Sequence, residues 1–239
     1  MIDIEVVLSP ALLHLAEVKN KNVVVIDILR ATSTICTAIH EGASSVRAVD
    51  SIDEALILRN QGYVIAGERN GHKIEGFDMG NSPFECMNGL LTDKKLALTT
   101  TNGTKCITAA MIAGASHVIA GSFLNIDATA NWLKTDNKAV ILLCAGWKDK
   151  VNLEDSLYAG ALSKKLLNFN QLKLECDSTF MVLDLYEKAA NNISEYLTKS
   201  SHYQRLSHLH HQEDMEYCLT ENKFTTVVGQ KNVEMFKIN

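Results

Sequence analysis

Short apolar runs alternate along the chain with polar loops and with segments of helical spacing. Runs of roughly four to six apolar residues are typical of strands that are buried on both faces. Such runs predict strands at residues 22–29, 62–67, 94–100, 117–122 and 138–146, and the first residues, 2–9, predict another. Helical spacing follows most of these runs, at residues 32–42, 105–114, 125–134 and 152–167.

The alternation of strands with helices predicts an α/β fold. Such a pattern gives a mostly parallel or mixed sheet flanked by helices, in a three-layer α/β/α architecture. After residue 170 the strand pattern fades: residues 180–209 predict helix, and residues 213–230 predict a helix, a turn and a short strand. The chain fits a single unit, 1–239, with two intertwined α/β halves that divide near 115–140 as the alternative.

Composition narrows the class of protein. Of the 239 residues, 46% are hydrophobic, which argues against a disordered or fibrous chain, and the formal net charge of −5 argues against a nucleic-acid partner. We expect no signal peptide and no membrane span. The six cysteines lack C-x-x-C spacing, which favours reduced thiols in a cytoplasmic protein. Symmetric dimers are common among soluble oligomers, so a homodimer is the expected assembly.

Polar side chains gather where the predicted strands end. In parallel sheets, ligands bind in the crevice beyond the carboxyl ends of the strands. The polar residues and the one glycine at these positions are Asp27, Arg30, Thr32, Ser33, Glu68, Arg69, Asn70, Asp78, Asn81, Thr100, Thr101, Asn102, Gly103, Thr104, Lys148, Glu154 and Asp155. Together they offer oxygen ligands for a cation and N–H donors for an anion.

Several of these residues also have a purely structural explanation. Thr32 or Ser33 could cap the helix that follows, and residues 100–104 could form a plain turn instead of an anion cradle. Acids in the first turn of a helix, at 154 and 155, could complement the helix dipole. The histidine run at 208–211 suits a solvated helix end better than a metal site.

Asp27 is harder to explain in this way. A carboxylate at the end of a buried strand needs a partner, because the burial of an unpaired charge is costly. Arg30 could be that partner in a structural ion pair. A divalent cation would serve as well, with Glu68, Glu154 or Asp155 completing a set of oxygen ligands. Mg²⁺ is usually held by one or two carboxylates, waters and substrate oxygens.

The motifs taken together resemble the 2-phosphosulfolactate phosphatases of the ComB type. The matching segments, in the order of that family, are "VVVIDILRATST", "AGERNGHKIEGFDMGNSP", "LTTTNGT", "GSFLN", "CAGWKDKVNLEDSLYAG" and "SSHYQRLSHLHHQEDMEYCL". The resemblance implies a Mg²⁺-dependent phosphatase that hydrolyses (2R)-2-phospho-3-sulfolactate to 3-sulfolactate and phosphate. In organisms that make coenzyme M, this step belongs to its biosynthesis. The implied partner is a small anionic phosphorylated substrate.

The resemblance also implies roles for particular residues. Asp27, Arg30 and Glu68 are the catalytic candidates, and Asp27, Glu154 and Asp155 are the candidate metal ligands. The candidate substrate-binding or phosphate-binding residues are Thr32, Ser33, Asn81, Thr101, Asn102, Gly103 and Thr104.

Three points stay open at this stage. Asp27 is either a metal ligand or a nucleophile, and Leu29 stands where haloacid-dehalogenase phosphatases need a second acid, which favours attack by water. The loop after "CAG" has Trp147 and Lys148, where the family tends to have a small hydroxyl residue and an acid. The rival functions are a phosphatase of another small phosphorylated 2-hydroxy acid and a non-catalytic anion-binding module.

Overall fold

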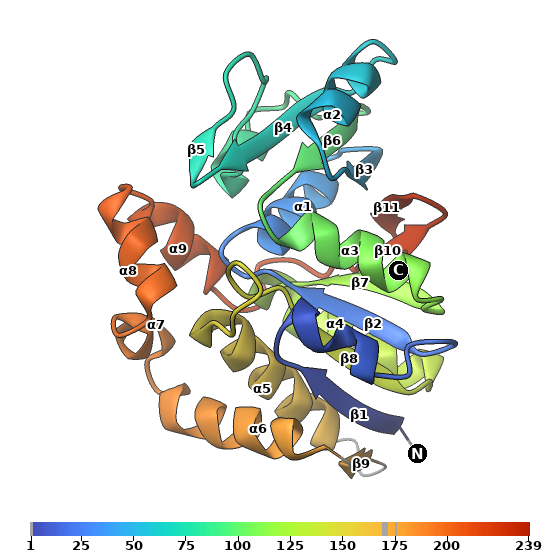
Figure 1. Ribbon diagram of the computed structural model, residues 1–239, viewed down its shortest axis with the longest axis vertical. Coiled ribbons are helices and arrows are strands. Elements are labelled where there is room, and N and C mark those ends of the chain that lie inside the picture. Colours follow the sequence, from blue (N-terminus) through green and yellow to red (C-terminus); the bar gives the residue numbers. More distant parts are fainter. Residues whose placement is uncertain (1, 169–171, 175) are drawn as a thin grey trace.

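The predicted strands assemble into one twisted mixed sheet (Figure 1). The computed structural model describes residues 2–168, 172–174 and 176–239. The strand order is β5-β4-β6-β3-β11-β10-β7-β2-β8-β1-β9. The strands are β1 (Ile2–Val7), β2 (Asn22–Ile26), β3 (Ser45–Ala48), β4 (Val64–Arg69), β5 (His72–Lys73), β6 (Lys95–Thr99), β7 (His117–Gly121), β8 (Val140–Cys144), β9 (Leu172–Leu174), β10 (Val228–Lys231) and β11 (Glu234–Lys237).

Two parallel groups of strands make up most of the sheet. β4, β6 and β3 are parallel to one another, and so are β7, β2, β8, β1 and β9. The antiparallel hairpin β10–β11 lies between the groups, where it meets β7 at Gly229–Ile119 and β3 at Met235–Val46. The predicted mixed α/β sheet is therefore confirmed, whereas the division of the chain into two halves near 115–140 stays a prediction.

Helices cover both faces of the sheet because its central strands are apolar on both sides. On β2, Val23 and Val25 pack into one core with α1 and α3, whereas Val24 and Ile26 pack into another with α4 and α5. The helices are α1 (Ala31–His40), α2 (Ile52–Arg59), α3 (Gly103–Ile112), α4 (Ile126–Asp136), α5 (Leu153–Leu167), α6 (Asp177–Ala189), α7 (Ile193–Leu197), α8 (Ser201–His208) and α9 (Gln212–Cys218). The two cores give the predicted three layers.

The predicted C-terminal helical region consists of three separate helices. Residues 180–209 are divided among α6, α7 and α8, because side chains within the segment cap new helix starts. The Asn192 side chain accepts a hydrogen bond from the Glu195 backbone N–H, and the Ser200 side chain accepts one from Tyr203. Such caps satisfy N–H groups that a helix start would otherwise leave unpaired. As a result α8 and α9 turn toward the carboxyl end of β2 (Figure 1).

Five other strands and helices of the described residues were not predicted from the sequence: β3, α2, β5, β9 and β11. Within the described ranges, none of the helices has the length and apolar character needed to cross a bilayer.

Candidate active site

A small polar cavity lies where the carboxyl ends of strands from both parallel groups meet. Asp27 follows β2, Glu68 lies in β4, and residues 100–102 follow β6. The cavity measures about 30 Å³, which is room for one or two water molecules. Its lining residues are Asp27, Leu29, Arg30, Glu68, Gly71, Asn81, Thr100, Thr101, Asn102, His202, Arg205 and Leu206. The last three come from α8, which closes the cavity over the sheet.

Asp27 is held from several sides at the base of the cavity. Its backbone N–H donates to Thr32 Oγ1 at 3.1 Å, and its Oδ1 accepts from the Ala31 N–H at 3.4 Å. Gly103 packs against the carboxyl group so closely that a Cβ there would lie 2.6 Å from Asp27 Oδ2. Burial raises the pKa of Asp27 to about 6, and the charges of Glu68 and Glu154 add to this effect, although His202 opposes it.

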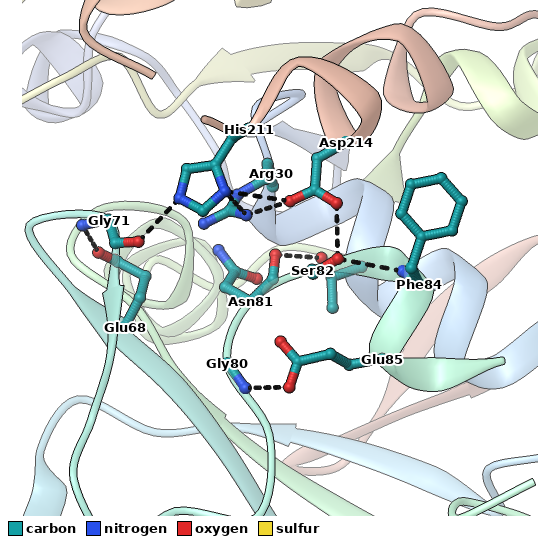
Figure 2. Close-up of polar contacts among 11 residues, drawn as sticks. Arg30, Glu68, Gly71, Gly80, Asn81, Ser82, Phe84, Glu85, His211 and Asp214 are labelled. Carbon is teal, nitrogen blue, oxygen red and sulfur yellow. Dashed lines mark hydrogen bonds and ion pairs between the residues drawn. The ribbon is translucent and has the colours of Figure 1, made fainter. Parts of the chain in front are cut away.

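Glu68 presents a second, rigidly held carboxylate to the same cavity. Its Oε1 accepts from the backbone N–H and the hydroxyl of Thr101, both at 2.8 Å. Its Oε2 accepts from the Gly71 N–H at 2.7 Å (Figure 2). These three donors come from two different loops, so Glu68 also fixes the loop after β6 against the β4–β5 turn.

The two carboxylates are oxygen ligands of the kind that a divalent cation can take. Among the described residues, no group of three or more His, Cys, Asp or Glu side chains is arranged to hold a metal. Mg²⁺ is commonly held by one or two carboxylates together with water and substrate oxygens. Asp27 and Glu68 therefore fit Mg²⁺, and a cation would offset the mutual repulsion of their charges.

Glu154 and Asp155, both expected as metal ligands, lie outside the cavity lining. Both are fully buried in the first turn of α5. Asp155 Oδ1 accepts from the Ile28 N–H and Oδ2 from the Gly146 N–H, each at 2.9 Å. Burial, together with the charges of Asp27 and Glu154, raises the pKa of Asp155 well above its usual range. Asp155 thus ties the loop that follows Asp27 to the loop that precedes Trp147.

Glu154 is instead the partner of His202. Its Oε1 is hydrogen-bonded to His202 Nδ1, and its Oε2 accepts from the Ser200 hydroxyl at 3.2 Å. Because His202 lines the cavity and its Nδ1 is already bonded, Nε2 is the ring nitrogen that can form a hydrogen bond with a ligand there. The Trp147 indole stacks on the His202 ring with centroids 5.9 Å apart, and the Arg205 guanidinium lies 5.1 Å from the same indole.

Arg30 connects the cavity to α9 through contacts with Asp214 and His211, and these three residues are called the clasp below (Figure 2). Its Nη1 pairs with Asp214 and lies 3.2 Å from His211 Nδ1. Asp214 Oδ1 accepts from the Ser82 hydroxyl at 2.6 Å, and His211 Nε2 lies 3.0 Å from the Gly71 carbonyl oxygen. Burial and the nearby Arg30 charge lower the pKa of His211, so the neutral ring accepts from Arg30 and donates to Gly71.

The predicted phosphate-binding residues fall into two sets. Asn81, Thr101 and Asn102 line the cavity, and Gly103 packs against Asp27. Thr32, Ser33 and Thr104 are fully buried behind it. There the Ser33 hydroxyl donates to the Ile28 carbonyl at 3.0 Å and Thr104 exchanges hydrogen bonds with Thr100, so these side chains shape the loops instead of facing a ligand.

Two polar residues of α8 that line the cavity, His202 and Arg205, were not among the predicted site residues. His202 had no assigned role, and Arg205 was not considered. The signal is present in "SHYQRL": residues three and four positions apart share one face of a helix, so His202, Arg205 and Leu206 form a single stripe. Trp147, noted only as a departure from the family pattern, is the side chain on which two of them stack.

We predict that Asp27→Asn stabilises the metal-free protein at neutral pH. The folded protein keeps a proton on Asp27 up to about pH 6, whereas an ordinary aspartic acid has a pKa of 3.8. Ionisation of Asp27 therefore lowers the free energy of unfolding as the pH rises from 3.8 to about 6, and below pH 3.8 it has no effect. The difference between the two pKa values corresponds to a loss of up to about 3 kcal/mol. Urea denaturation in EDTA should show the variant more stable than the parent at about pH 8, with a smaller advantage towards pH 4.

Asp184→Asn is the matched control for this measurement, because Asp184 is exposed on α6. It should change the free energy of unfolding by less than about 0.5 kcal/mol. A position-27 variant that loses stability at high pH, or whose gain does not depend on pH, would contradict the burial of an ionising Asp27.

We predict that Asp214→Asn destabilises the protein because it leaves the Arg30 guanidinium buried without a counter-charge. The pair is almost completely buried, with side-chain exposures of 4% and 8%, and the loss of one partner of such a pair costs about 3–5 kcal/mol. Glu187→Gln is the control, since its pair with Lys164 is exposed and contributes less than about 1 kcal/mol. Equal shifts of the two urea midpoints would rule out an energetic role for the clasp.

Known proteins match this chain over nearly its whole length. The family model for 2-phosphosulpholactate phosphatase matches residues 7–233. Proteins named "Probable 2-phosphosulfolactate phosphatase" are 42% identical over 224 residues in Thermotoga petrophila (94% of this chain, 93% of the relative) and 41% identical over 229 residues in Thermotoga maritima (96% of each). One of the same name in Caldanaerobacter subterraneus is 39% identical over 220 residues (90% of each). The resemblance of the motifs is thereby confirmed, and the chain belongs to the 2-phosphosulpholactate phosphatase family.

Proposed function

We propose that this protein hydrolyses (2R)-2-phospho-3-sulfolactate to 3-sulfolactate and phosphate with the help of Mg²⁺. Membership of the family makes it a phosphoric monoester hydrolase, and the relatives described above bear the name of this substrate. The observation that carries the proposal is the cavity that Asp27 and Glu68 share with the guanidinium groups of Arg30 and Arg205. A cation beside the acids and an anionic substrate beside the arginines would leave no charge unpaired.

The starts of α1 and α3 meet beside Asp27, next to the cavity. Gly103 and Ala31 are the first residues of α3 and α1, and a Cβ on Gly103 would lie 2.8 Å from the Ala31 Cβ. This packing leaves little space between the two helix starts, and the Ala31 and Thr104 N–H groups already donate to Asp27 and Thr100. The positive ends of the two helix dipoles still favour an anionic substrate in the neighbouring cavity.

The metal would be held by Asp27 and Glu68, in place of the acids at 154 and 155. Both side chains line the cavity, and Glu68 is fixed by donors from Thr101 and Gly71. When bound there, Mg²⁺ would neutralise phosphoryl oxygens and hold a water molecule.

Asp27 is the group that receives the proton of the attacking water. Without a metal, burial raises its pKa to about 6. A cation beside it would lower that pKa and keep Asp27 ionised, which is the form that accepts a proton. Water attacks phosphorus, its proton passes to Asp27, and the bond from phosphorus to the C2 oxygen breaks. The absence of an acid at position 29 supports this route over a covalent aspartyl-phosphate.

His202 supplies the proton that the leaving oxygen needs. A secondary alkoxide is a poor leaving group, so protonation by a positioned acid accelerates the reaction by roughly 10²–10⁴-fold. Glu154 holds His202 through Nδ1, which leaves Nε2–H to donate to the C2 oxygen. The proposed base, Asp27, thus follows strand β2, whereas the proposed acid, His202, lies on helix α8.

The first test is a phosphate-release assay on 2-phospho-3-sulfolactate. We expect the parent protein to release phosphate with Mg²⁺ and to stop in EDTA. We expect Asp27→Asn to lose at least roughly a hundredfold in kcat, while Asp184→Asn keeps parental turnover. A position-27 variant with parental turnover would refute the role of Asp27.

The same assay separates the rival functions. Preference for 2-phospholactate or phosphoglycolate over the sulfonated substrate would identify a phosphatase of another hydroxy acid. Tight binding of these anions without any release of phosphate would identify a non-catalytic binding module.

The second test varies the leaving group. Acetyl phosphate releases acetate, which needs no proton, so His202→Asn should lower kcat on 2-phospho-3-sulfolactate by roughly a hundredfold and change acetyl phosphate hydrolysis far less. Glu154→Gln should show the same pattern in weaker form. His208→Asn, on the exposed side of the same helix, is the control. Equal losses on both substrates would exclude His202 as the general acid.

A cytoplasmic location is part of the proposal. It is supported by the cysteines, all six of which are free thiols, as is usual in a reducing compartment. The homodimer stays a prediction.

A further inference from the structure

We propose that Arg205, held against Trp147, recognises the anionic group of the substrate that is not the phosphate, and that it thereby sets substrate preference. This inference rests on the proposed function, because it assumes a substrate with a second anion beside the phosphate ester. Sulfonate and carboxylate share the relevant chemistry, a pair of negatively charged oxygens on one atom that a guanidinium fork can bind through two hydrogen bonds.

The first observation concerns charge. Arg30 and Arg205 both line the cavity, but the charge of Arg30 is balanced by its buried pair with Asp214. Among the described residues, Arg205 forms no ion pair: its Nη1 donates to the Asn70 carbonyl oxygen at 3.1 Å, and its Nε is buried without a partner. A buried donor without a partner costs about 1–3 kcal/mol. A ligand oxyanion would remove this cost.

The second observation concerns rigidity. The Arg205 guanidinium lies 5.1 Å from the Trp147 ring, and the His202 ring stacks on the same indole at 5.9 Å. The Trp147 loop is itself fixed, because the Trp147 N–H donates to the Lys150 carbonyl at 2.9 Å and the Lys150 N–H donates back at 3.1 Å. Gly146 fits this turn with a φ of +61°, and any Cβ there would lie 2.1 Å from the Lys150 carbonyl oxygen. The fork is therefore oriented before the ligand arrives, which lowers the entropy lost on binding.

The third observation concerns position. Asp27 and Glu68, which are assigned to the phosphoryl transfer, lie at the carboxyl ends of β2 and β4, whereas Arg205 lies on α8. His202 is the residue of α8 that is assigned to the reaction, so Arg205 offers a second cation that the reaction itself does not use. Trp147 acts through Arg205 and is a positioning residue.

The test compares three phosphate esters of secondary alcohols that differ in their other anionic groups. 2-Phospho-3-sulfolactate has a sulfonate and a carboxylate, 2-phospholactate has only the carboxylate, and glycerol 2-phosphate has neither. We expect Arg205→Gln to lower kcat/KM for 2-phospho-3-sulfolactate by roughly tenfold to a hundredfold, mainly through KM. We expect it to change kcat/KM for glycerol 2-phosphate less than about threefold. A loss with 2-phospholactate would identify the carboxylate as the recognised group, and no loss would identify the sulfonate.

Two further variants keep the test decisive. Trp147→Ala should weaken the preference among the three esters without removing it, and Arg47→Gln, at an exposed pair on β3, should leave the preference unchanged. Equal losses on all three esters, or no loss on 2-phospho-3-sulfolactate, would overturn the proposal. If the parent protein hydrolyses only the other two esters, the proposed function fails, and the ratio of 2-phospholactate to glycerol 2-phosphate in Arg205→Gln still decides the role of Arg205.

Discussion

The first turn of α5 fixes both walls of the cavity through two adjacent buried carboxyl groups. Asp155 accepts from the backbone of Ile28 and Gly146, and Glu154 holds His202. Asn152 caps the helix with a hydrogen bond from the Asp155 N–H, which sets where the turn begins. Because charged groups are costly to bury, each carboxyl oxygen here is matched to a donor. These two acids, predicted as metal ligands together with Asp27, make the hydrogen bonds that join the walls of the cavity.

Three carboxyl groups lie in or beside the cavity, and the repulsion among their charges lowers the stability of the folded protein. Asp27, Glu68 and Glu154 lie close enough for the last two to raise the pKa of the first. Functional sites commonly keep such perturbed groups. On the other side, the clasp of Arg30 with Asp214 and His211 attaches α9 to the loops after β2 and β4. Buried pairs of this kind contribute more to position than to net stability.

The sequence predicted the central strands well because their apolar runs are long and unbroken. β3 was missed since "SVRA" is short and half polar, and β11 has no apolar run. Among the site residues, Asp27 and Glu68 were found because they lie at strand ends, where the chain order alone places them. Arg205 and His202 could not be placed in this way, because their position depends on the packing of α8 against the sheet. The pairings of Glu154 and Arg30 likewise join residues far apart in the chain and leave no local pattern.

The position of the β10–β11 hairpin in the middle of the sheet has a consequence for biosynthesis. A nascent chain on the ribosome can form β2, β7 and β8, and also β3, β4 and β6, long before residues 228–237 have been made. Until then β7 and β3 each present an unpaired edge, which is a template for association with other chains. The same delay applies to α8 and α9. The growing polypeptide therefore acquires its stable sheet and its complete cavity at almost the same moment, near the end of translation of the segment seen here.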